Sequence, residues 1–299
     1  MRSSENLALF DGRTLFFGPS SPASGRTLIM GILNINDDSF YSGSRVRGAE
    51  AAALRALQMA RDGADIIDIG AESTRPGSSG LDERFELEVL IPAIKSVRKA
   101  LPDMPISADT RKSAVASASI EAGADIVNDV SGLGLPDERE NMLRLLTESG
   151  AAYVLTHPGD GHWGPSERLG KNDGDDIMSE LLSFFSERIE MISGAGVARD
   201  RIIIDPGIGF GKRPEDNLDI MANIGELKRL GLPILVGASR KSFIGHILEQ
   251  PDPADRIEGT LAISAICADR GVEIVRAHDV LENRRAVLMA GAVRRRSPQ

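Results

Sequence analysis

Cysteine is almost absent from this sequence. The single Cys267 has no partner within the chain, which excludes an intrachain disulfide. It lies in an alanine-rich helical stretch, so we interpret it as a small buried core residue. His157 and His278 are far apart and no histidine–cysteine cluster exists, so the sequence offers no zinc site of that kind.

Long apolar runs and an excess of positive charge are also missing. No stretch reaches the roughly 18 uninterrupted apolar residues of a membrane span, and residues 1–6 lack the apolar segment of a signal peptide. The 35 lysines and arginines are outnumbered by 44 acidic residues, which gives a net charge of -9. Because nucleic acids and anionic lipid surfaces attract a basic face, we expect neither partner and predict a cytoplasmic protein. Small anionic substrates stay open, since a few local cations can outweigh the net charge.

The chain does contain a repeated unit of apolar run, polar end and helical stretch. Eight short runs rich in isoleucine and valine begin near residues 30, 66, 106, 126, 153, 202, 234 and 272, and each ends on a polar residue. They lack alternation of apolar and polar residues, as expected of strands buried on both faces of a parallel sheet. Glycines precede four of the runs, at Gly63, Gly123, Gly150 and Gly271, and each indicates a helix end before a strand.

Strands that alternate with helices predict an α/β fold built from parallel βαβ units. Eight such units favour a closed (β/α)8 TIM barrel over an open Rossmann-type sheet. We assign residues 27–292 to this barrel, 1–26 to an N-terminal β-hairpin that closes its bottom, and 293–299 to a tail. The carboxyl ends of barrel strands meet on one face, where active sites lie. The polar residues that end the runs should therefore form one ring, which favours an enzyme.

The glycine-rich segment 205–212 looks like a phosphate loop but fits neither common pattern. A P-loop would need glycine at Pro206 and serine or threonine at Arg213, and a dinucleotide fingerprint would need glycine at Lys212. One interpretation is a structural turn after a buried strand. The alternative, which we favour, is that Phe210, held between glycines, offers a stacking surface for a flat ligand.

Carboxylates or an amide end three separate runs, at Asp109, Asn128 and Asp205. Carboxylates accept hydrogen bonds from N–H groups, and an Asn amide both donates and accepts. Together they suit a planar heterocycle with an amino-pyrimidinone edge. Each residue alone could cap a helix, but three caps at once is the weaker interpretation. A buried carboxylate also needs a partner against desolvation, and Lys241 is the natural one.

Cations form a second group at the predicted strand ends, namely Arg75, Arg240, Lys241, Arg276 and His278. With the backbone N–H groups of the helices that follow, they suit a phosphate or diphosphate. A salt bridge is the alternative for Arg75 and Arg276, and it is the preferred interpretation for Arg240. No Gly-x-Ser-x-Gly elbow is present, so a serine nucleophile is not expected. Magnesium held by substrate phosphates needs only one side-chain oxygen, such as that of Asn34.

Eight segments occur in a fixed order along the chain. They are MGILN (30–34), DDSF (37–40), ESTRPG (72–77), SADT (107–110), NDVSG (128–132), DPGIGFGK (205–212), SRKSFIG (239–245) and RAHDV (276–280). Together they resemble the dihydropteroate synthase family, pterin-binding enzymes of the folate pathway. Each segment alone is weakly specific, whereas the ordered set is highly specific and covers nearly the whole barrel.

The resemblance implies condensation of 6-hydroxymethyl-7,8-dihydropterin diphosphate with 4-aminobenzoate, which gives 7,8-dihydropteroate and diphosphate. It implies a dissociative displacement, in which the electron-rich pterin stabilises a methylene cation as diphosphate leaves. Such chemistry needs a neutralised leaving group and exclusion of water rather than a strong base. The resemblance also implies magnesium as the cofactor and a homodimer formed through the later helices.

Carried over by position, the resemblance assigns roles to individual residues. The pterin ring would be held by Asp109, Asn128, Asp205 and Lys241, of which Asp109, Asp205 and Lys241 would be catalytic. The diphosphate would be bound by Asn34, through magnesium, and by Arg75, Arg276 and His278. The aminobenzoate would be contacted by Thr74, Arg75, Pro76, Phe210 and Ser242, and Phe40 would lie in the first loop.

Two positions depart from the family pattern. The first loop of the family usually has Thr-Pro where this chain has Asn36 and Asp37, which frees the backbone and adds negative charge near the diphosphate. After the fifth strand the family commonly has Met before His, whereas here Thr156 precedes His157, and the role of His157 stays open.

Two alternative functions also stay open. One is a pterin-binding methyltransferase domain that acts with a corrinoid protein, which would not need segments 73–77 and 239–242. Both segments are present, so the synthase is favoured. The other alternative is a relative that binds pterin without turnover, and only the departure at Asn36 and Asp37 suggests it.

Overall fold

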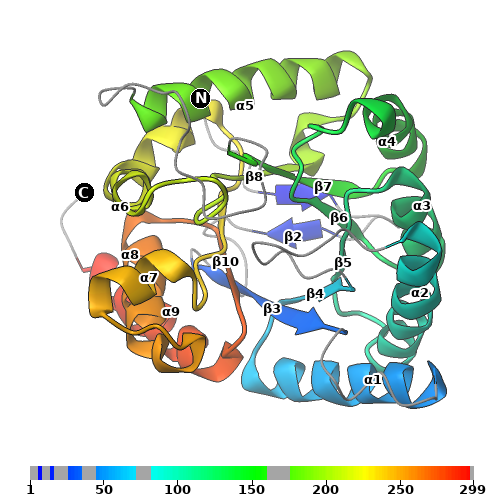
Figure 1. Cartoon of the computed structure of the whole chain (residues 1–299), viewed down its shortest axis with the longest axis horizontal. Helices are drawn as coiled ribbons and strands as arrows, with labels where there is room; N and C mark the ends of the chain where they lie inside the picture. Colours follow the sequence, from blue (N-terminus) through cyan, green and yellow to red (C-terminus); the bar gives the residue numbers. More distant parts are fainter. Residues whose placement is uncertain are drawn as a thin grey trace.

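The computed structural model of the chain describes residues 6–8, 14–16, 26–35, 45–71, 82–159 and 176–296. Its centre is a parallel sheet curled into a barrel (Figure 1). The strands are β3 (Leu28–Asn34), β4 (Ile66–Gly70), β5 (Ile106–Asp109), β6 (Ile126–Asp129), β7 (Ala152–Thr156), β8 (Ile202–Asp205), β9 (Leu235–Val236) and β10 (Ile274–Ala277). Their order is β8-β7-β6-β5-β4-β3-β10-β9, and a parallel bridge between Ile204 and Ile234 joins the two end strands. The predicted (β/α)8 barrel is therefore confirmed.

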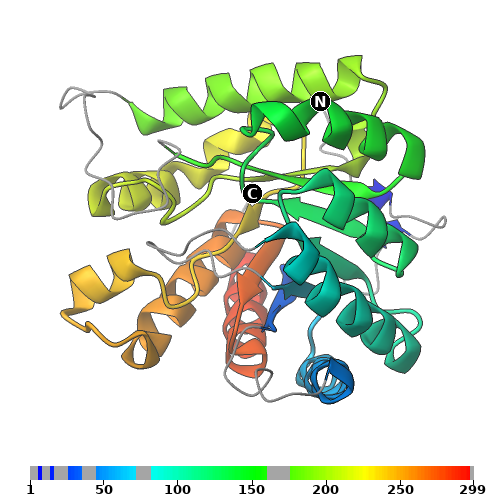
Figure 2. The ribbon, with the colours of Figure 1, turned by 45° about the vertical axis from the view of Figure 1, so that its right-hand side comes forward.

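Helices surround the strands and follow one another around the barrel in chain order (Figures 1 and 2). Their bounds are α1 (Arg45–Asp62), α2 (Glu83–Ala100), α3 (Ser113–Glu121), α4 (Pro136–Ser149), α5 (Ile177–Gly194), α6 (Pro214–Asn223), α7 (Ser242–Leu248), α8 (Ile257–Arg270) and α9 (Val280–Arg294). The short α7 is an additional helix between β9 and α8. Within the described ranges, no helix is long and apolar enough to cross a membrane.

Left-handed glycines end helices where the sequence predicts helix ends. α4 is followed by Gly150 with φ 75°, and α8 by Gly271 with φ 72°. Only glycine adopts this conformation without a Cβ penalty, and it closes the last helical turn. The chain then enters β7 and β10 within a few residues, so the strands start at a defined level of the barrel.

The strands divide their side chains between two apolar layers. The barrel interior contains Leu28, Met30, Ile66, Ile126, Ala152, Val154, Ile203, Leu235 and Ile274. A larger layer between strands and helices contains the residues that alternate with them, such as Tyr153 and Leu155 of β7. Because successive side chains of a strand point to opposite faces, the residue two positions after an interior residue also faces the interior. This alternation decides which polar residues line the barrel at its carboxyl end.

The chain also forms the predicted N-terminal hairpin, in which β1 (Asn6–Ala8) pairs antiparallel with β2 (Thr14–Phe16). β1 contacts the 3-10 turn Arg199–Arg201, which leads into the amino end of β8. The hairpin therefore lies at the bottom of the barrel, opposite the face where the strand carboxyl ends meet. At the other end of the chain α9 runs to Arg294, past the predicted barrel boundary at 292.

Candidate active site

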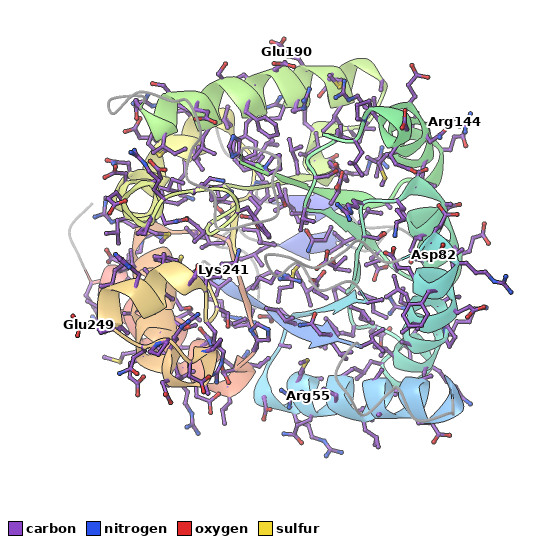
Figure 3. The ribbon with its side chains drawn as sticks, in the orientation of Figure 1. Arg55, Asp82, Arg144, Glu190, Lys241 and Glu249 are labelled. Atoms are coloured by element: carbon purple, nitrogen blue, oxygen red, sulfur yellow. The ribbon has the colours of Figure 1, made fainter. Side chains whose placement is uncertain are left out.

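Polar side chains lie above the apolar interior on five strands. They are Asp68 on β4, Asp109 on β5, Asn128 on β6, Asp205 on β8 and Arg276 on β10. Four of these lie two positions after Ile66, Ile126, Ile203 and Ile274 of the interior cluster, as the alternation requires. The carboxylates and the amide are at most 7% exposed. The predicted ring of functional groups therefore exists on the carboxyl face, and Figure 3 labels Lys241 beside it, inside the circle of helices.

Arg276 is the centre of an ionic cluster inside this ring. Its Nε donates to Oδ2 of Asp68 at 2.7 Å, and its Nη2 donates to Oδ2 of Asp109 at 2.6 Å. The Asn128 amide donates to both carboxylate oxygens of Asp68 at 3.3 Å. Burial lowers the pKa of the Arg276 guanidinium, but the charges of Asp68 and Asp109 outweigh burial and raise the pKa above its ordinary value. Arg276 therefore fixes the Asp109 carboxylate in place.

This cluster realises the salt-bridge alternative for Arg276. The guanidinium is 15% exposed and is shared between two carboxylates, so most of its charge is already matched within the protein. Its predicted role as a diphosphate ligand stays a prediction. Asp68 is a site residue that was not predicted, although a charged residue in the middle of a buried apolar run is a signal for one.

Asp205 ends β8 with its carboxylate held by the following turn. Oδ1 accepts a hydrogen bond from the Gly207 backbone N–H at 2.8 Å, and the residue is 5% exposed. Burial raises the pKa of Asp205, while the positive charge of Lys241, the hydrogen bond from Gly207 and the charge of Arg276 act against it. Asp205 and Lys241 thus form the carboxylate–lysine pair that the sequence predicts, although through their charges rather than a direct hydrogen bond.

Lys241 lies just before α7 and turns its ammonium toward the ring. Nζ donates to the carbonyl oxygen of Ile208 and lies 3.9 Å from the centroid of the Phe210 ring. Burial lowers the pKa of Lys241 to about 8, against the raising effect of Asp205. The Phe210 ring is half-buried with this cation over it, so one of its faces is already occupied. The predicted stacking role of Phe210 stays a prediction.

Lys212 organises the glycine-rich turn after β8. Its Nζ donates to the carbonyl oxygens of His157 at 3.2 Å, Gly207 at 3.0 Å and Phe210 at 3.2 Å. Gly207 has φ 67°, and a Cβ there would lie 2.0 Å from the His157 carbonyl oxygen, so only glycine fits. The segment is thus a structural turn that ties β8 to the end of β7 and fixes Phe210. No pattern in the sequence indicates this role of Lys212.

The remaining cations lie near the rim of the ring. Arg240 forms a two-point salt bridge with Asp279, with Nε–Oδ2 and Nη2–Oδ1 distances of 2.9 Å. The preferred interpretation of Arg240 as a salt-bridge residue is therefore confirmed. His278 is half-buried, and its Nδ1 lies 3.0 Å from Oγ of Ser239. This contact orients the imidazole at the carboxyl end of β10 and leaves its diphosphate role as a prediction.

Other predicted site residues are exposed or outside the described ranges. Ser242 begins α7 and is exposed, and Asn34 ends β3 and is exposed at the mouth of the barrel. Thr74, Arg75, Pro76, Phe40 and the Asn36–Asp37 departure lie outside the described residues. Among the described residues, no three histidine, cysteine or carboxylate side chains come together as a metal site.

The arrangement can bind a flat, polar ring inside the barrel. Acceptors stand on β5 and β8, an amide on β6 and an ammonium beside β8, all on the interior side. A family profile described as pterin binding enzyme matches residues 30–278, which include every one of these side chains. The chain belongs to the pterin-binding enzyme family.

Relatives in this family share most of the chain. The protein is 43% identical over 255 residues to a dihydropteroate synthase of Synechocystis sp., covering 85% of this chain and 86% of that protein. A structure of dihydropteroate synthase from Clostridium difficile in the presence of pteroic acid matches with a TM-score of 0.80 and 43% identity, over 90% of this chain and 97% of that chain. A structure of the Xanthomonas albilineans dihydropteroate synthase with 4-aminobenzoic acid matches with a TM-score of 0.83 and 35% identity, over 98% and 100% of the two chains.

Proposed function

We propose that the protein is a dihydropteroate synthase of folate biosynthesis. It joins 6-hydroxymethyl-7,8-dihydropterin diphosphate to 4-aminobenzoate and releases diphosphate. The observation that carries this proposal is the convergence of Asp109, Asn128, Asp205 and Lys241 on the barrel interior. The similar proteins named with pteroic acid and with 4-aminobenzoic acid support the same substrates.

The four residues suit the polar groups of a pterin ring. Asp109 and Asp205 carry carboxylate acceptors for the ring amino and N–H groups, and the Asn128 amide both donates and accepts. Lys241 supplies a donor for a ring carbonyl or nitrogen. Because Arg276 and the Gly207 N–H hold the two carboxylates in place, little reorganisation is needed when the ring enters.

The bond-breaking step calls for charge neutralisation rather than a base. Loss of diphosphate leaves positive charge on the pterin methylene, and the neutral aromatic amine then attacks it. The buried carboxylates Asp109 and Asp205 would stabilise positive charge that develops on the ring, whereas His278 and Arg276 would neutralise charge on the leaving group, as the resemblance implies. No strong general base is required, which agrees with a site built of carboxylates, an amide and cations.

Magnesium fits the exposed amide of Asn34 as a hard oxygen donor at the mouth of the barrel. The described residues offer no cluster of three histidine, cysteine or carboxylate ligands, so the ion would take its other ligands from water and the diphosphate. When bound, it neutralises the charge of the leaving group. Asn34 would hold it, and Arg75 would complete the diphosphate site as the resemblance implies.

The aminobenzoate would lie outside the pterin, toward the rim. Phe210 would contact its ring, and Ser242 at the start of α7 would meet its carboxylate. Thr74, Arg75 and Pro76 would cover it from the first βα loops. We also propose a cytoplasmic location for a folate enzyme of this kind. The lone Cys267 is fully buried.

The test of this function is a product assay. The protein is incubated with the pterin diphosphate, 4-aminobenzoate and Mg²⁺, and 7,8-dihydropteroate and diphosphate are measured by chromatography. We expect release of diphosphate to require both substrates and the ion. Pterin binding without release would identify a non-catalytic relative, and methyl transfer from a methylated folate would identify the corrinoid-linked class.

The lowered pKa of Lys241 predicts how activity and stability depend on pH. With a pKa of about 8 it loses its proton as the pH rises through that value, so kcat/KM for the pterin substrate should fall there. The stability of the ligand-free protein should change with pH in the opposite direction. The folded pKa lies below the ordinary 10.5, so this group's contribution to the free energy of unfolding rises between about pH 8 and 10.5.

A pH series of initial rates, paired with urea denaturation of the ligand-free protein, separates the two effects. In Lys241→Arg the guanidinium keeps its charge throughout, so the fall near pH 8 should disappear. A decline at the same pH in both proteins would assign the titration to another group.

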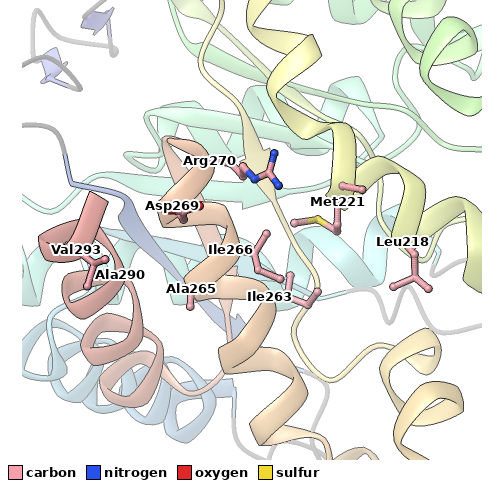
Figure 4. A pocket seen from close by; sticks show the side chains of 10 residues that line it. Leu218, Met221, Ile263, Ala265, Ile266, Asp269, Arg270, Ala290 and Val293 are labelled. Carbon is pink, nitrogen blue, oxygen red and sulfur yellow. The ribbon is translucent and has the colours of Figure 1, made fainter. Parts of the chain in front are cut away.

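We also propose that the protein forms a homodimer through α6, α8 and α9. These helices line a groove of about 670 Å³ whose apolar side chains include Leu218, Met221, Ile266 and Val293 (Figure 4). Leu218 is 44% exposed, Ile266 40% and Val293 55%, which is a large apolar surface to leave in water.

The dimer predicts a simple mutational result. Replacing Leu218 and Ile266 with glutamate places two charges in the shared surface, and we expect monomers in sedimentation equilibrium where the unmodified protein is dimeric. Leu54→Glu, on the exposed face of α1, serves as the matched control, since Leu54 is 69% exposed. A monomeric unmodified protein would contradict the proposal.

A further inference from the structure

Two buried hydroxyls on the interior side of the barrel strands have no hydrogen-bond partner among the described residues, those of Ser107 on β5 and Thr156 on β7, and Thr156 is the one at the carboxyl end of its strand. Thr156 ends β7 and is 0% exposed, and no group among the described residues hydrogen-bonds to its Oγ1. A buried hydroxyl without a hydrogen bond costs free energy, and such atoms are uncommon in native proteins. A valine would fill the same volume without this cost. The hydroxyl therefore calls for a partner that the described part of the chain does not supply.

The position of Thr156 places this hydroxyl at the interior wall of the site. Val154, two residues earlier, belongs to the interior cluster, so alternation turns Thr156 to the same side. In the sheet Thr156 pairs with Asp205 of β8, and Val154 pairs with Asn128 of β6. Thr156 thus lies directly beside the Asp205 carboxylate on β8, and the Asn128 amide on β6 lies diagonally across, level with Val154.

The groups on either side define the part of a ligand that would reach this hydroxyl. Asp205 is an acceptor, so the ring edge in front of it carries N–H donors. In an amino-pyrimidinone ring that edge contains the amino group, which has two hydrogens, and the adjacent ring N–H. A carboxylate accepts from one amino hydrogen and the ring N–H, and the second amino hydrogen needs another acceptor. A threonine hydroxyl on the next strand supplies one.

We infer that Thr156 is a further ligand of the pterin ring, whose Oγ1 accepts a hydrogen bond from the ring amino group between Asn128 and Asp205. The inference rests on the proposed function, since it takes the ligand to be a pterin. It makes Thr156 a specificity-determining residue, and it gives a purpose to the departure from the Met that the family commonly has at this place in the chain.

The test compares three side chains at this position. Thr156→Val keeps the shape and removes the hydroxyl, and Thr156→Ser keeps the hydroxyl. The dissociation constant of 6-hydroxymethyl-7,8-dihydropterin diphosphate with Mg²⁺ is measured by calorimetry. We expect the valine variant to bind about five- to tenfold more weakly and the serine variant to bind within about twofold of the parent. The KM for 4-aminobenzoate should not change.

The stability of the ligand-free protein distinguishes a ligand-binding role of the Thr156 hydroxyl from a structural one. Removing an unpartnered hydroxyl should leave the melting temperature unchanged or raise it, whereas a hydroxyl that supported the fold would lower it. Ser119→Ala is the matched control, because Ser119 on α3 carries an equally buried, unpartnered hydroxyl outside the barrel. It should leave pterin binding unchanged.

A ligand lacking the amino group completes the test. The corresponding 2-desamino pteridine should bind the parent and the valine variant equally, since the lost contact is absent from both. Equal affinity of parent and valine variant for the pterin diphosphate would overturn the inference and leave the proposed function intact. A parent protein that binds no pterin diphosphate would overturn both, and a valine variant weakened equally toward both ligands would overturn the assignment to the amino group.

Discussion

Replacing Lys241 with methionine is expected to lower kcat/KM for the pterin diphosphate by about 100- to 1000-fold, the usual effect of removing one preorganised charged donor. Lys241 is the cation that the fold holds beside Asp205, and its Nζ is already committed to the Ile208 carbonyl and the Phe210 ring. Methionine keeps the length and the apolar stem and loses only the charge. The rate is measured from product formation at low pterin concentration.

The same substitution should not destabilise the ligand-free protein. Burial lowers the pKa of Lys241 to about 8, which means that the surroundings disfavour its charged form. Removing the charge therefore removes a cost, and the urea midpoint should be unchanged or higher. Lys95→Met, at an exposed lysine of α2, controls for loss of a lysine as such. Full activity in Lys241→Met would disprove the assignment of the site.

The second large effect is expected from Arg276→Met, on stability. This variant leaves Asp68 and Asp109 as buried carboxylates without their cation, and breaking a buried ion pair from one side costs about 3–5 kcal/mol of unfolding free energy. Activity should fall as well, because the Asp109 carboxylate loses the contact that orients it. Urea denaturation at pH 7 measures the loss.

Three comparisons make this result specific to the buried cluster. Arg240→Met removes a salt bridge whose partners are 25% and 23% exposed and two hydrogen bonds to the carbonyl oxygens of Pro253 and Ala254, so it should cost about 1–2 kcal/mol. In Arg276→Met the unpaired carboxylates take up protons more readily, so the deficit should shrink as the pH is lowered. Adding Asp68→Asn to Arg276→Met should restore part of the stability. A loss no larger than that of Arg240→Met would show that the cluster is not what holds these strand ends together.

The two effects follow from different uses of charge in one barrel. Arg276 is matched by two carboxylates, so its removal is felt first by the fold. Lys241 is the less well matched cation, so its removal is felt first by the ligand. A site that binds a polar ring needs both kinds of cation. A fully paired cation such as Arg276 fixes the geometry of the carboxylates, and a less well paired one such as Lys241 supplies an interaction that the ligand completes.

The sequence by itself determined the fold class and the members of the ring other than Asp68. Eight unalternating apolar runs separated by helical stretches indicate a parallel sheet buried on both faces, and their number favours closure into a barrel over an open sheet. The period of two along each strand then places Asn128, Asp205 and Arg276 above their interior neighbours. These are local properties of the chain, so they can be deduced without knowing which strands meet.

Only the tertiary structure decided which of these groups touch. Arg276 lies 208 positions from Asp68 and 167 from Asp109, and no spacing in the sequence indicates that it joins them rather than a ligand. The pairing depends on closure of the barrel, which brings β10 beside β3 and across the interior from β5. The same closure leaves the Thr156 hydroxyl without a hydrogen-bond partner among the described residues, which depends on every neighbouring side chain at once. Local strand geometry sets the face of the sheet to which a side chain points, whereas the closed barrel sets which side chains come within contact distance.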